Sequence, residues 1–211
     1  MDSMQQFIGK QFGSATLESE IGRGAMGAVF RGHQNVLKRP VAVKIMLTNL
    51  MGDKTAAQRF HKEALATASL KSPHIVQIYD AGVTKDGLFF MVMEFLEGET
   101  LDTLLERKQH FHLQDAIHLI QQIASGLQTA HQSGLTHRDI KPSNIIVDPQ
   151  QHATITDFGL VRNRSEVRQT QTNVILGTPA YLAPEQASNV EPDARTDIYS
   201  LGIVFYEMLT G

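Results

Sequence analysis

Four polar motifs that suit the handling of phosphate groups follow one another along the chain, and they constrain its fold more than any other feature. They occupy residues 22–27, 41–44, 137–144 and 157–159. Backbone N–H groups of a glycine-rich loop can approach phosphate oxygens, a lysine supplies a positive charge, and aspartate and asparagine side chains offer oxygen ligands to Mg²⁺. The fold must therefore bring together segments that are more than a hundred residues apart.

The glycine-rich segment contains Gly22, Gly24 and Gly27, and this spacing also fits the turn that binds dinucleotides. A dinucleotide-binding turn follows a strand and opens a helix. In this chain the apolar residues 28–30 and 41–43 favour further strands after the glycines. The pattern therefore favours a β-hairpin that covers phosphate groups.

Lys44 ends the second motif, and by itself a lysine on a strand is an ordinary surface residue. Residues 56–70 have the composition of a helix, on which Glu63 shares a face with Phe60 and Thr67. Glu63 is therefore predicted to pair with Lys44. This pair would direct the lysine ammonium toward the α- and β-phosphates of a nucleotide.

The segment 137–144 is the most specific motif, because it places Asp139, Lys141 and Asn144 in one loop. A polar turn without a function is the alternative. Asp157 follows Asp139 by eighteen residues, as a phosphoryl-transfer site requires. Asp139 is predicted to orient the attacking hydroxyl group and Lys141 to neutralise charge on the transferred phosphoryl group, whereas Asn144 and Asp157 are predicted to bind the metal.

The first half of the chain has the pattern of a sheet with one helix. Apolar side chains alternate along residues 41–45, as in a half-buried strand, and Asp86 followed by Gly87 is a hairpin signal. Residues 21–95 are therefore predicted to form a small, sheet-rich lobe.

The second half is predicted to be mainly helical. Residues 113–132 place an apolar stripe on one helix face, and Gly134 follows as a stop signal. Residues 145–147 and 153–156 predict two short strands around a turn. Residues 197–209 carry apolar side chains all around a helix, which predicts burial on every side and a further C-terminal part of the domain that covers it. The predicted stripe consists of Ile117, Ile120, Ala124, Leu127 and His131.

The composition excludes several classes of protein. Of the 211 residues, 42% are hydrophobic and 19% are charged, with a net charge of −3, which argues against disorder and against a nucleic-acid-binding surface. No segment has the roughly 20 apolar residues that span a membrane, and the N-terminus lacks the features of a signal peptide. The absence of cysteine excludes disulfides and is compatible with the cytoplasm. His110 and His112 have no third ligand at a suitable spacing, which favours a solvated loop over a metal site.

Together the motifs resemble those of the eukaryotic-like protein kinases, and most closely the bacterial serine/threonine branch. The resemblance covers residues 21–211, and residues 141–143 and 177–181 are similar to the serine/threonine rather than the tyrosine class. It implies an α+β, bilobal protein-kinase-like fold with a strand-rich N-lobe and a mainly helical C-lobe that lacks its last helices. The implied domains are an N-terminal extension at 1–15, an N-lobe at 16–96 and an incomplete C-lobe at 97–211.

The resemblance also implies an ATP site between the two lobes. Met93 is similar to the gatekeeper residue of the family, and residues 94–96 are similar to the hinge, whose backbone would bond the adenine edge. From their residue types alone these positions are ordinary core positions. The implied nucleotide contacts are Ile21, Gly22, Gly24, Gly27, Val29, Ala42, Lys44, Met93, Glu94, Leu96, Asn144, Ile146 and Asp157.

Arg138 indicates control by phosphorylation, because an arginine beside the catalytic aspartate can pair with a phosphate on residues 157–185. Thr170 and Thr172 are the predicted sites of autophosphorylation, and Ser165 is a weaker candidate. The alternative is that these hydroxyl groups are ordinary solvated loop residues.

The resemblance implies two further contacts. Thr178 would contact Asp139 and Lys141 and help to define the acceptor site. Glu185 would pair with an arginine of a later helix, which this sequence does not contain.

The predicted reaction is transfer of the ATP γ-phosphoryl group to serine or threonine hydroxyls of proteins, with Mg²⁺, or Mn²⁺ in its place, as the metal. The expected partners are ATP, protein substrates and, by resemblance, a second copy of the chain for autophosphorylation. One alternative is a nucleotide-binding pseudokinase scaffold, which the complete residue set disfavours. The other is an inactive, truncated fragment. The predicted catalytic residues are Lys44, Glu63, Asp139 and Lys141, and the predicted metal ligands are Asn144 and Asp157.

Overall fold

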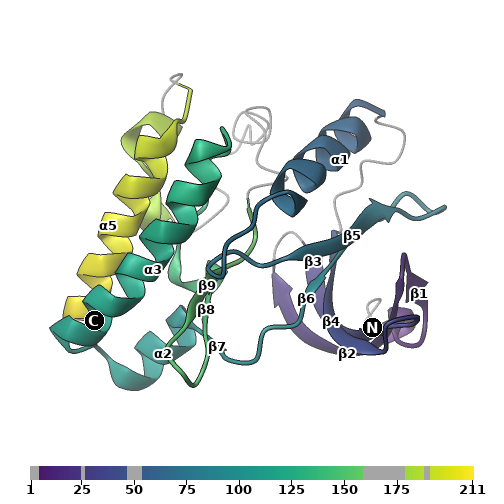
Figure 1. The fold of residues 1–211 in the computed structure, drawn as a ribbon, viewed down its shortest axis with the longest axis horizontal. Helices are drawn as coiled ribbons and strands as arrows, with labels where there is room; N and C mark the ends of the chain where they lie inside the picture. The colour runs from purple at the N-terminus through teal and green to yellow at the C-terminus, as the bar shows by residue number, and fades with distance from the viewer. Residues whose placement is uncertain (1–4, 25–26, 47–53, 159–178, 188–190) are drawn as a thin grey trace. The chain divides into compact units, whose positions relative to one another are not determined.

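The computed structural model describes residues 5–24, 27–46, 54–158, 179–187 and 191–211, apart from the side chains of 54–59, 63 and 179 (Figure 1). The chain divides into two units, each with its own core. Unit 1 contains Met1–Ser69 and Val76–Leu96, and unit 2 contains Leu70–Ile75 and Glu97–Gly211. Unit 1 is built mainly of strands and unit 2 mainly of helices, so the predicted α+β class is confirmed.

Unit 1 is built on a six-stranded sheet in the order β1-β2-β3-β4-β6-β5, in which all neighbouring strands are antiparallel. The strands are β1 (Gln11–Phe12), β2 (Ala15–Gly24), β3 (Gly27–Gln34), β4 (Arg39–Met46), β5 (Ile78–Val83) and β6 (Phe89–Glu94). β5 and β6 form the hairpin that Asp86 and Gly87 predict, and Gly87 has the positive φ of 80° that such a turn needs.

Aromatic side chains fill the core of unit 1. The ring of Phe7, in the 3₁₀ helix η1 (Gln5–Phe7), lies edge-on 5.6 Å from Phe12 and 6.5 Å from Phe30. Phe12 in turn lies 5.8 Å from Phe90 of β6. Edge-to-face pairs of this kind contribute about 0.5–1.5 kcal/mol each beyond the burial of their surface. Residues predicted as an N-terminal extension therefore contribute to the same core as β3 and β6.

The helix α1 (Lys54–Ala68) packs beside β5 and begins and ends two residues before the predicted range of 56–70. Phe60 is buried, and its ring lies 5.0 Å from that of Phe89 on β6. Thr67 is also buried. Glu63 belongs to α1, whereas its side chain lies outside the described part of the chain.

Unit 2 combines a three-stranded sheet with helices. Its elements are β7 (Glu99–Thr100), α2 (Leu101–Lys108), α3 (Leu113–Gln132), η2 (Pro142–Asn144), β8 (Ile145–Val147), β9 (Ala153–Ile155), η3 (Pro179–Tyr181), η4 (Pro184–Ala187) and α5 (Ala194–Thr210). The predicted range of 113–132 for α3 is confirmed, and Gly134 ends this helix with a φ of 74°. The two predicted short strands are also confirmed, as β8 and β9.

α3 and α5 lie side by side in opposite directions (Figure 1). Near one end, the N–H of Phe111 donates to the carbonyl oxygen of Met208 over 2.7 Å. Near the other end, the imidazole of His131 lies 2.7 Å from the carboxylate of Asp197. This pairing brings the start of α5 beside the end of α3.

The apolar stripe predicted for α3 is only partly correct. Ile117 is 39% exposed, and Ile120 and Ala124 are partly buried. Most of the fully buried residues lie one position before those of the predicted stripe. The reason is that α3 packs against β9 as well as α5 and so has two apolar faces. The buried residues of α3 are Ala116, Leu119, Gln122, Ile123, Gly126, Leu127 and Ala130.

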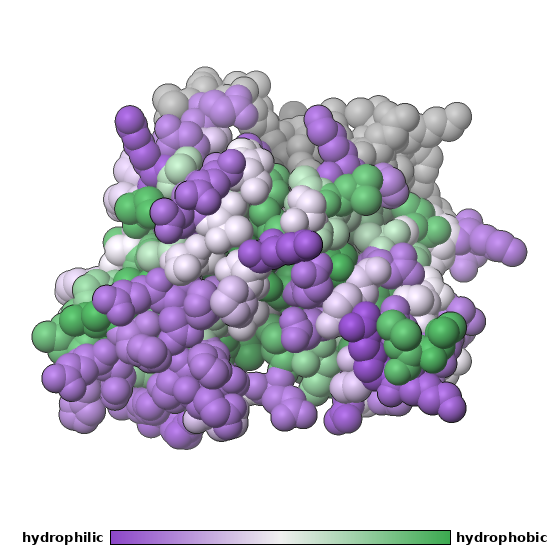
Figure 2. All heavy atoms as spheres, in the orientation of Figure 1, coloured by the Kyte–Doolittle hydropathy of each residue, from purple (hydrophilic) through white to green (hydrophobic). Residues whose placement is uncertain are grey.

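α2 is amphipathic. Its three leucines, Leu101, Leu104 and Leu105, are buried, whereas the charged residues of its last turn, Glu106, Arg107 and Lys108, are exposed. Figure 2 shows hydrophilic side chains over the region of α2, as expected for its solvent-facing side. α2 thus covers one part of the unit 2 core.

α5 begins at an N-cap aspartate, Asp193, whose carboxylate accepts a hydrogen bond from the N–H of Arg195 over 2.7 Å. Within the described residues α5 packs against α3 along one side, so its burial on every side by a further C-terminal part of the domain stays a prediction. Its buried apolar residues are Leu201, Val204 and Met208, and its exposed ones are Ile198, Tyr199 and Tyr206.

Candidate active site

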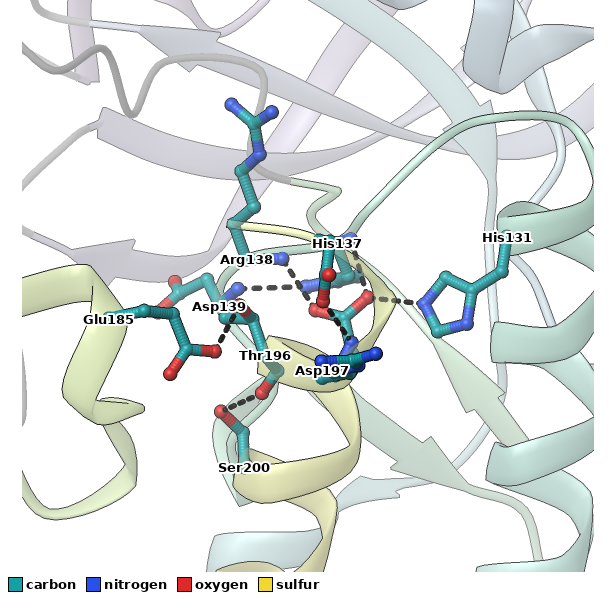
Figure 3. A network of polar contacts seen from close by, with 10 residues as sticks. His131, His137, Arg138, Asp139, Glu185, Thr196, Asp197 and Ser200 are labelled. Atoms are coloured by element: carbon teal, nitrogen blue, oxygen red, sulfur yellow. Dashed lines mark hydrogen bonds and ion pairs between the residues drawn. The ribbon is translucent and has the colours of Figure 1, made fainter. Parts of the chain in front are cut away.

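The loop between α3 and β8 is held by a carboxylate from α5. The backbone N–H groups of His137 and Arg138 donate to Oδ2 and Oδ1 of Asp197, each over 2.8 Å. Asp197 is fully buried, and its Oδ2 also lies 2.7 Å from Nε2 of His131 (Figure 3). Arg138 has a φ of 66°, an uncommon conformation for a residue with a side chain. The bonds to Asp197 thus hold a strained backbone in place.

His137 is buried and uncharged. The N–H of Asp139 donates to its Nδ1 over 3.2 Å, so this nitrogen carries no proton. Its Nε2 lies 2.8 Å from the carbonyl oxygen of Thr156 and is therefore the protonated nitrogen. Burial lowers the pKa of His137, although the nearby carboxylate of Asp197 and the bond to Thr156 act in the opposite direction.

The loop and the short helix η2 bring three predicted site residues together, with Asp139 and Lys141 before η2 and Asn144 at its end. Nζ of Lys141 lies 3.1 Å from Oδ2 of Asp139. The side-chain amide of Asn144 donates to the carbonyl oxygen of Asp139 over 2.8 Å and to its Oδ2 over 3.2 Å. Because the amide nitrogen of Asn144 is used in this way, its amide oxygen remains to ligate a metal ion.

The antiparallel pairing of β8 and β9 places Asp157 near the same loop. Ile145 pairs with Ile155, so the residues before β8 and after β9 leave the sheet at the same end. The N–H of Thr156 accordingly donates to the carbonyl oxygen of Asn144 over 2.8 Å. Asp157 follows with a φ of 58°. The ring of Phe158, next along the chain, lies 4.6 Å from that of His137.

In unit 1 the glycine-rich segment forms the predicted hairpin of β2 and β3, with Gly24 paired to Gly27. A Cβ atom at Gly27 would lie 2.0 Å from the carbonyl oxygen of Ile45, so the fold itself requires glycine there. A Cβ atom at Gly22 or Gly24 would meet no heavy atom within 4 Å. Packing within the described residues therefore does not explain these two glycines.

Lys44 lies on β4 between the buried residues Val43 and Ile45, and its side chain is half-buried. It pairs in the sheet with Val29 on one side and Met91 on the other. The alternation of the strand therefore places Lys44 on the opposite face of the sheet from its two neighbours.

Four residues predicted to contact adenine lie in one apolar cluster of unit 1. Ala42 and Met93 are buried in it together with Val76, which the sequence analysis did not single out. Ile21 is 50% exposed, and Glu94 donates its N–H to the carbonyl oxygen of Gln77. The four residues are Val29, Ala42, Met93 and Leu96. Ile146, which was also predicted to contact adenine, belongs to β8 of unit 2.

Several predicted residues lie outside the described part of the chain. They are Gly159, Ser165, Thr170, Thr172 and Thr178, together with the side chain of Glu63. Glu185 is described, and its carboxylate accepts a hydrogen bond from the hydroxyl of Thr196 over 2.6 Å (Figure 3).

Two residues with evident roles at the site, Asp197 and His131, were not predicted as site residues. A carboxylate in the first turn of α5 was the signal available for Asp197. Its partners are backbone groups, which no spacing of side chains identifies.

The donor set suits a magnesium ion that also binds phosphate oxygens. Among the described residues, no group of three or more His, Cys, Asp or Glu side chains could hold a metal ion. Mg²⁺ commonly takes one or two protein ligands and fills its other positions with water and substrate phosphates. The amide oxygen of Asn144 and the carboxylate of Asp157 fit this pattern.

The sequence model described as the protein kinase domain matches residues 15–211. The chain belongs to the protein kinase family. Members of this family generally use ATP and Mg²⁺. In the described part of this kinase domain, no helix combines the length and apolarity needed to cross a membrane.

Bacterial serine/threonine kinases are similar to this kinase domain. The serine/threonine-protein kinase PrkC of Bacillus subtilis is 40% identical over 205 residues, which are 97% of this chain and 32% of PrkC. PknL of Mycobacterium tuberculosis is 41% identical over 196 residues, which are 92% of this chain and 49% of PknL. The chain thus spans about a third to a half of the length of these relatives.

Solved kinase domains share the fold. The crystal structure of a single-residue mutant of the Mycobacterium tuberculosis PknI kinase domain has a TM-score of 0.79 and 24% sequence identity. The match covers 95% of this chain and 75% of that one. The predicted protein-kinase-like fold is therefore confirmed.

Proposed function

We propose that the chain transfers the γ-phosphoryl group of ATP to serine or threonine hydroxyls of protein substrates. The observation that carries this proposal is the arrangement of Asp139, Lys141 and Asn144 around one carboxylate oxygen. A carboxylate, an ammonium group and an amide at these distances are what in-line phosphoryl transfer uses. The similarity to named serine/threonine kinases supports the choice of acceptor.

Asp139 would accept, or orient, the proton of the attacking hydroxyl group. Lys141 lies beside it and would neutralise negative charge on the transferred phosphoryl group. Since the loop is held by His137 and Asp197, these groups need little reorganisation during the reaction. No covalent intermediate on the protein is required.

Asn144 and Asp157 would hold Mg²⁺, which neutralises phosphate charge when bound. The bond between Thr156 and Asn144 keeps the two segments that carry these ligands next to each other. Both ligands therefore come from one rigid end of the β8–β9 pair.

Gly22, Gly24 and Lys44 would bind the phosphates of ATP from unit 1. The two glycines support this role because a side chain at either position would contact no described part of the chain. Their lack of a side chain suits close approach of a ligand to the backbone. Glu63 would orient Lys44, and the residues around Met93, with Ile21 and Ile146, would contact adenine.

Regulation would use phosphorylation of Thr170 or Thr172, with the phosphate pairing with Arg138. Transfer between two copies of the chain, as a homodimer, would provide this phosphate. The need for ATP favours the cytoplasm as the compartment in which the reaction takes place.

A transfer assay with γ-labelled ATP, Mg²⁺ and a generic protein acceptor tests the proposal. We expect the chain to label the acceptor and Asp139→Asn to lower the rate by about 100-fold or more. Asp148→Asn, in the turn between β8 and β9, serves as the control and should leave the rate unchanged. No labelling by a folded chain that binds ATP would contradict the proposal and favour a nucleotide-binding scaffold.

A further inference from the structure

The side-chain amide of Gln186 joins two segments that are far apart in the sequence. Gln186 belongs to η4, and its Oε1 accepts a hydrogen bond from the N–H of Ala183 over 3.0 Å. Its Nε2 donates to the carbonyl oxygen of Arg138 over 2.8 Å. Both ends of the amide are therefore used, one within its own segment and the other on the loop between α3 and β8, which we call the catalytic loop.

The carbonyl group that Gln186 binds belongs to the peptide between Arg138 and Asp139. Asp197 accepts a hydrogen bond from the N–H of Arg138, and His137 accepts one from the N–H of Asp139. Gln186 supplies the remaining contact, to the carbonyl oxygen between these two N–H groups. The peptide that precedes the catalytic carboxylate is thus held by two side chains, those of Gln186 and His137, and Asp197 holds the peptide before it.

The contact from Gln186 helps to keep the strained backbone at Arg138 in place. Arg138 has a φ of 66°, and a residue in this conformation persists only where its surroundings fix it. A rotation of the Arg138–Asp139 peptide would move the carboxylate of Asp139 relative to Lys141 and Asn144. Small displacements of a catalytic group can lower a rate by about 100-fold.

We propose that Gln186 is a positioning residue for Asp139, which acts by fixing the carbonyl group of Arg138. The proposal rests on the proposed phosphotransferase function and adds a residue to its machinery. It requires the hydrogen-bond donor of the amide, because a carbonyl oxygen accepts but cannot donate. Gln186→Glu keeps the shape and the acceptor for Ala183 and removes this donor, and Gln186→Met removes the donor without adding a charge beside Arg138.

The chain offers a matched control in Gln122 of α3. Its Nε2 donates to the carbonyl oxygen of Gln151 over 2.8 Å, and its Oε1 accepts from the N–H of Ala153 over 2.9 Å. Gln122 thus makes the same two bonds as Gln186, but to the turn between β8 and β9 and not to the catalytic loop. It is 9% exposed, so Gln122→Glu tests the general effect of such a change on folding.

Steady-state kinetics of the 211-residue chain and its variants test the proposal. We expect both Gln186 variants to lower kcat by about tenfold or more, with KM for ATP changed less than about threefold. Gln122→Glu should lower the melting temperature at least as much and leave kcat within about twofold. The proposal is wrong if the Gln186 variants keep the wild-type kcat, or if Gln122→Glu lowers kcat to the same extent.

Amide hydrogen exchange provides a readout that does not depend on catalysis. In a peptide covering residues 136–144, Gln186→Met should exchange faster than the wild type, whereas Gln122→Glu should not. Absence of phosphoryl transfer by the folded wild type would contradict the proposed function. Exchange would still decide the positioning role, because equal exchange in all three proteins would overturn it.

Discussion

At the scale of single residues, one buried carboxylate determines much of the geometry of the site. Asp197 accepts hydrogen bonds from two consecutive backbone N–H groups and contacts His131. A carboxylate can accept several such bonds at once, whereas an amide or hydroxyl group cannot replace all of them. Asp197 is therefore a structural requirement of the catalytic loop although no substrate contact is assigned to it.

We predict that Asp197→Ala lowers the free energy of unfolding by about 2–4 kcal/mol, because a buried and a part-buried N–H group lose their acceptor. The same change should lower kcat by about 100-fold through displacement of Asp139. Urea denaturation and the transfer assay measure the two effects. Ser200→Ala is the control, because Ser200 is buried on the same helix and bonds to Tyr181 and Thr196, not to the catalytic loop. Equal losses of kcat in both variants would contradict the prediction.

A second prediction concerns pH and His137, whose pKa burial lowers from an ordinary value of 6.5. The unfolded chain binds a proton at this imidazole near pH 6.5, whereas the folded chain does so only at lower pH. Acidification below pH 6.5 therefore favours the unfolded state, and the free energy of unfolding should fall by up to about 1.4 kcal/mol per pH unit from this group.

The test compares the wild type with His137→Gln by urea denaturation between pH 8 and pH 5. The other histidines are present in both proteins, so the difference in slope isolates His137. The wild type should lose stability more steeply as the pH falls. Parallel curves would show that His137 binds protons equally in the folded and unfolded states, which would contradict a lowered pKa.

The residues of the catalytic loop were predictable because their chemistry appears in fixed spacing. Asp139, Lys141 and Asn144 lie close together, as the sequence predicts. Asp197 and Gln186 were not predictable, since each acts on backbone atoms of the loop from a distant segment. Only the folded chain shows such contacts.

At the scale of elements, the β2–β3 hairpin contains two glycines, and the physical reason for having glycine differs between the two positions. Gly27 lies against the backbone of Ile45, whereas Gly24 faces no described atom within 4 Å of a Cβ position. We predict that Gly27→Ala lowers the free energy of unfolding by about 2–3 kcal/mol through this overlap. Gly24→Ala should change stability by less than about 0.5 kcal/mol and raise KM for ATP. Thermal denaturation and kinetics of the two variants measure this contrast, and equal stability of both would contradict it.

α3 illustrates what periodicity predicts and what it misses. Its bounds were predicted correctly because a long apolar pattern ends at Gly134. Its buried face was predicted only in part, because Gly126 allows close approach to His74 and Ile155, where a Cβ atom would lie 2.9 Å from the carbonyl oxygen of His74. A glycine adds nothing to an apolar stripe, so the stripe alone did not reveal this second contact.

At the scale of the whole molecule, residues of both units are predicted to bind ATP. We predict that saturating ATP and Mg²⁺, at about 100 times Kd, stabilise the chain by about 2.7 kcal/mol and raise Tm by roughly 5–10 °C. Lys44→Met in unit 1 and Asp157→Asn in unit 2 should each reduce this shift strongly. Lys85→Met changes an exposed lysine in the turn before β6 and should keep the full shift. If either site variant kept the full rise in Tm, the residue changed in that variant would not belong to the ATP site.

The class of the fold could be predicted from the motifs and from the change of pattern along the chain. The role of the first residues could not, because Phe7 and Phe12 are two isolated aromatic residues in a polar stretch. Their place in the core depends on Phe30 and Phe90, which lie much later in the sequence.

The hydrogen bonds between Asp197 and the catalytic loop also have a consequence for the synthesis of the chain. A ribosome makes His137 sixty residues before it makes the carboxylate that fixes it. A nascent chain that has emerged only as far as β9 contains Asp139, Lys141 and Asn144 without their anchor on α5. The growing polypeptide therefore carries an unfixed catalytic loop until α5 has left the ribosome.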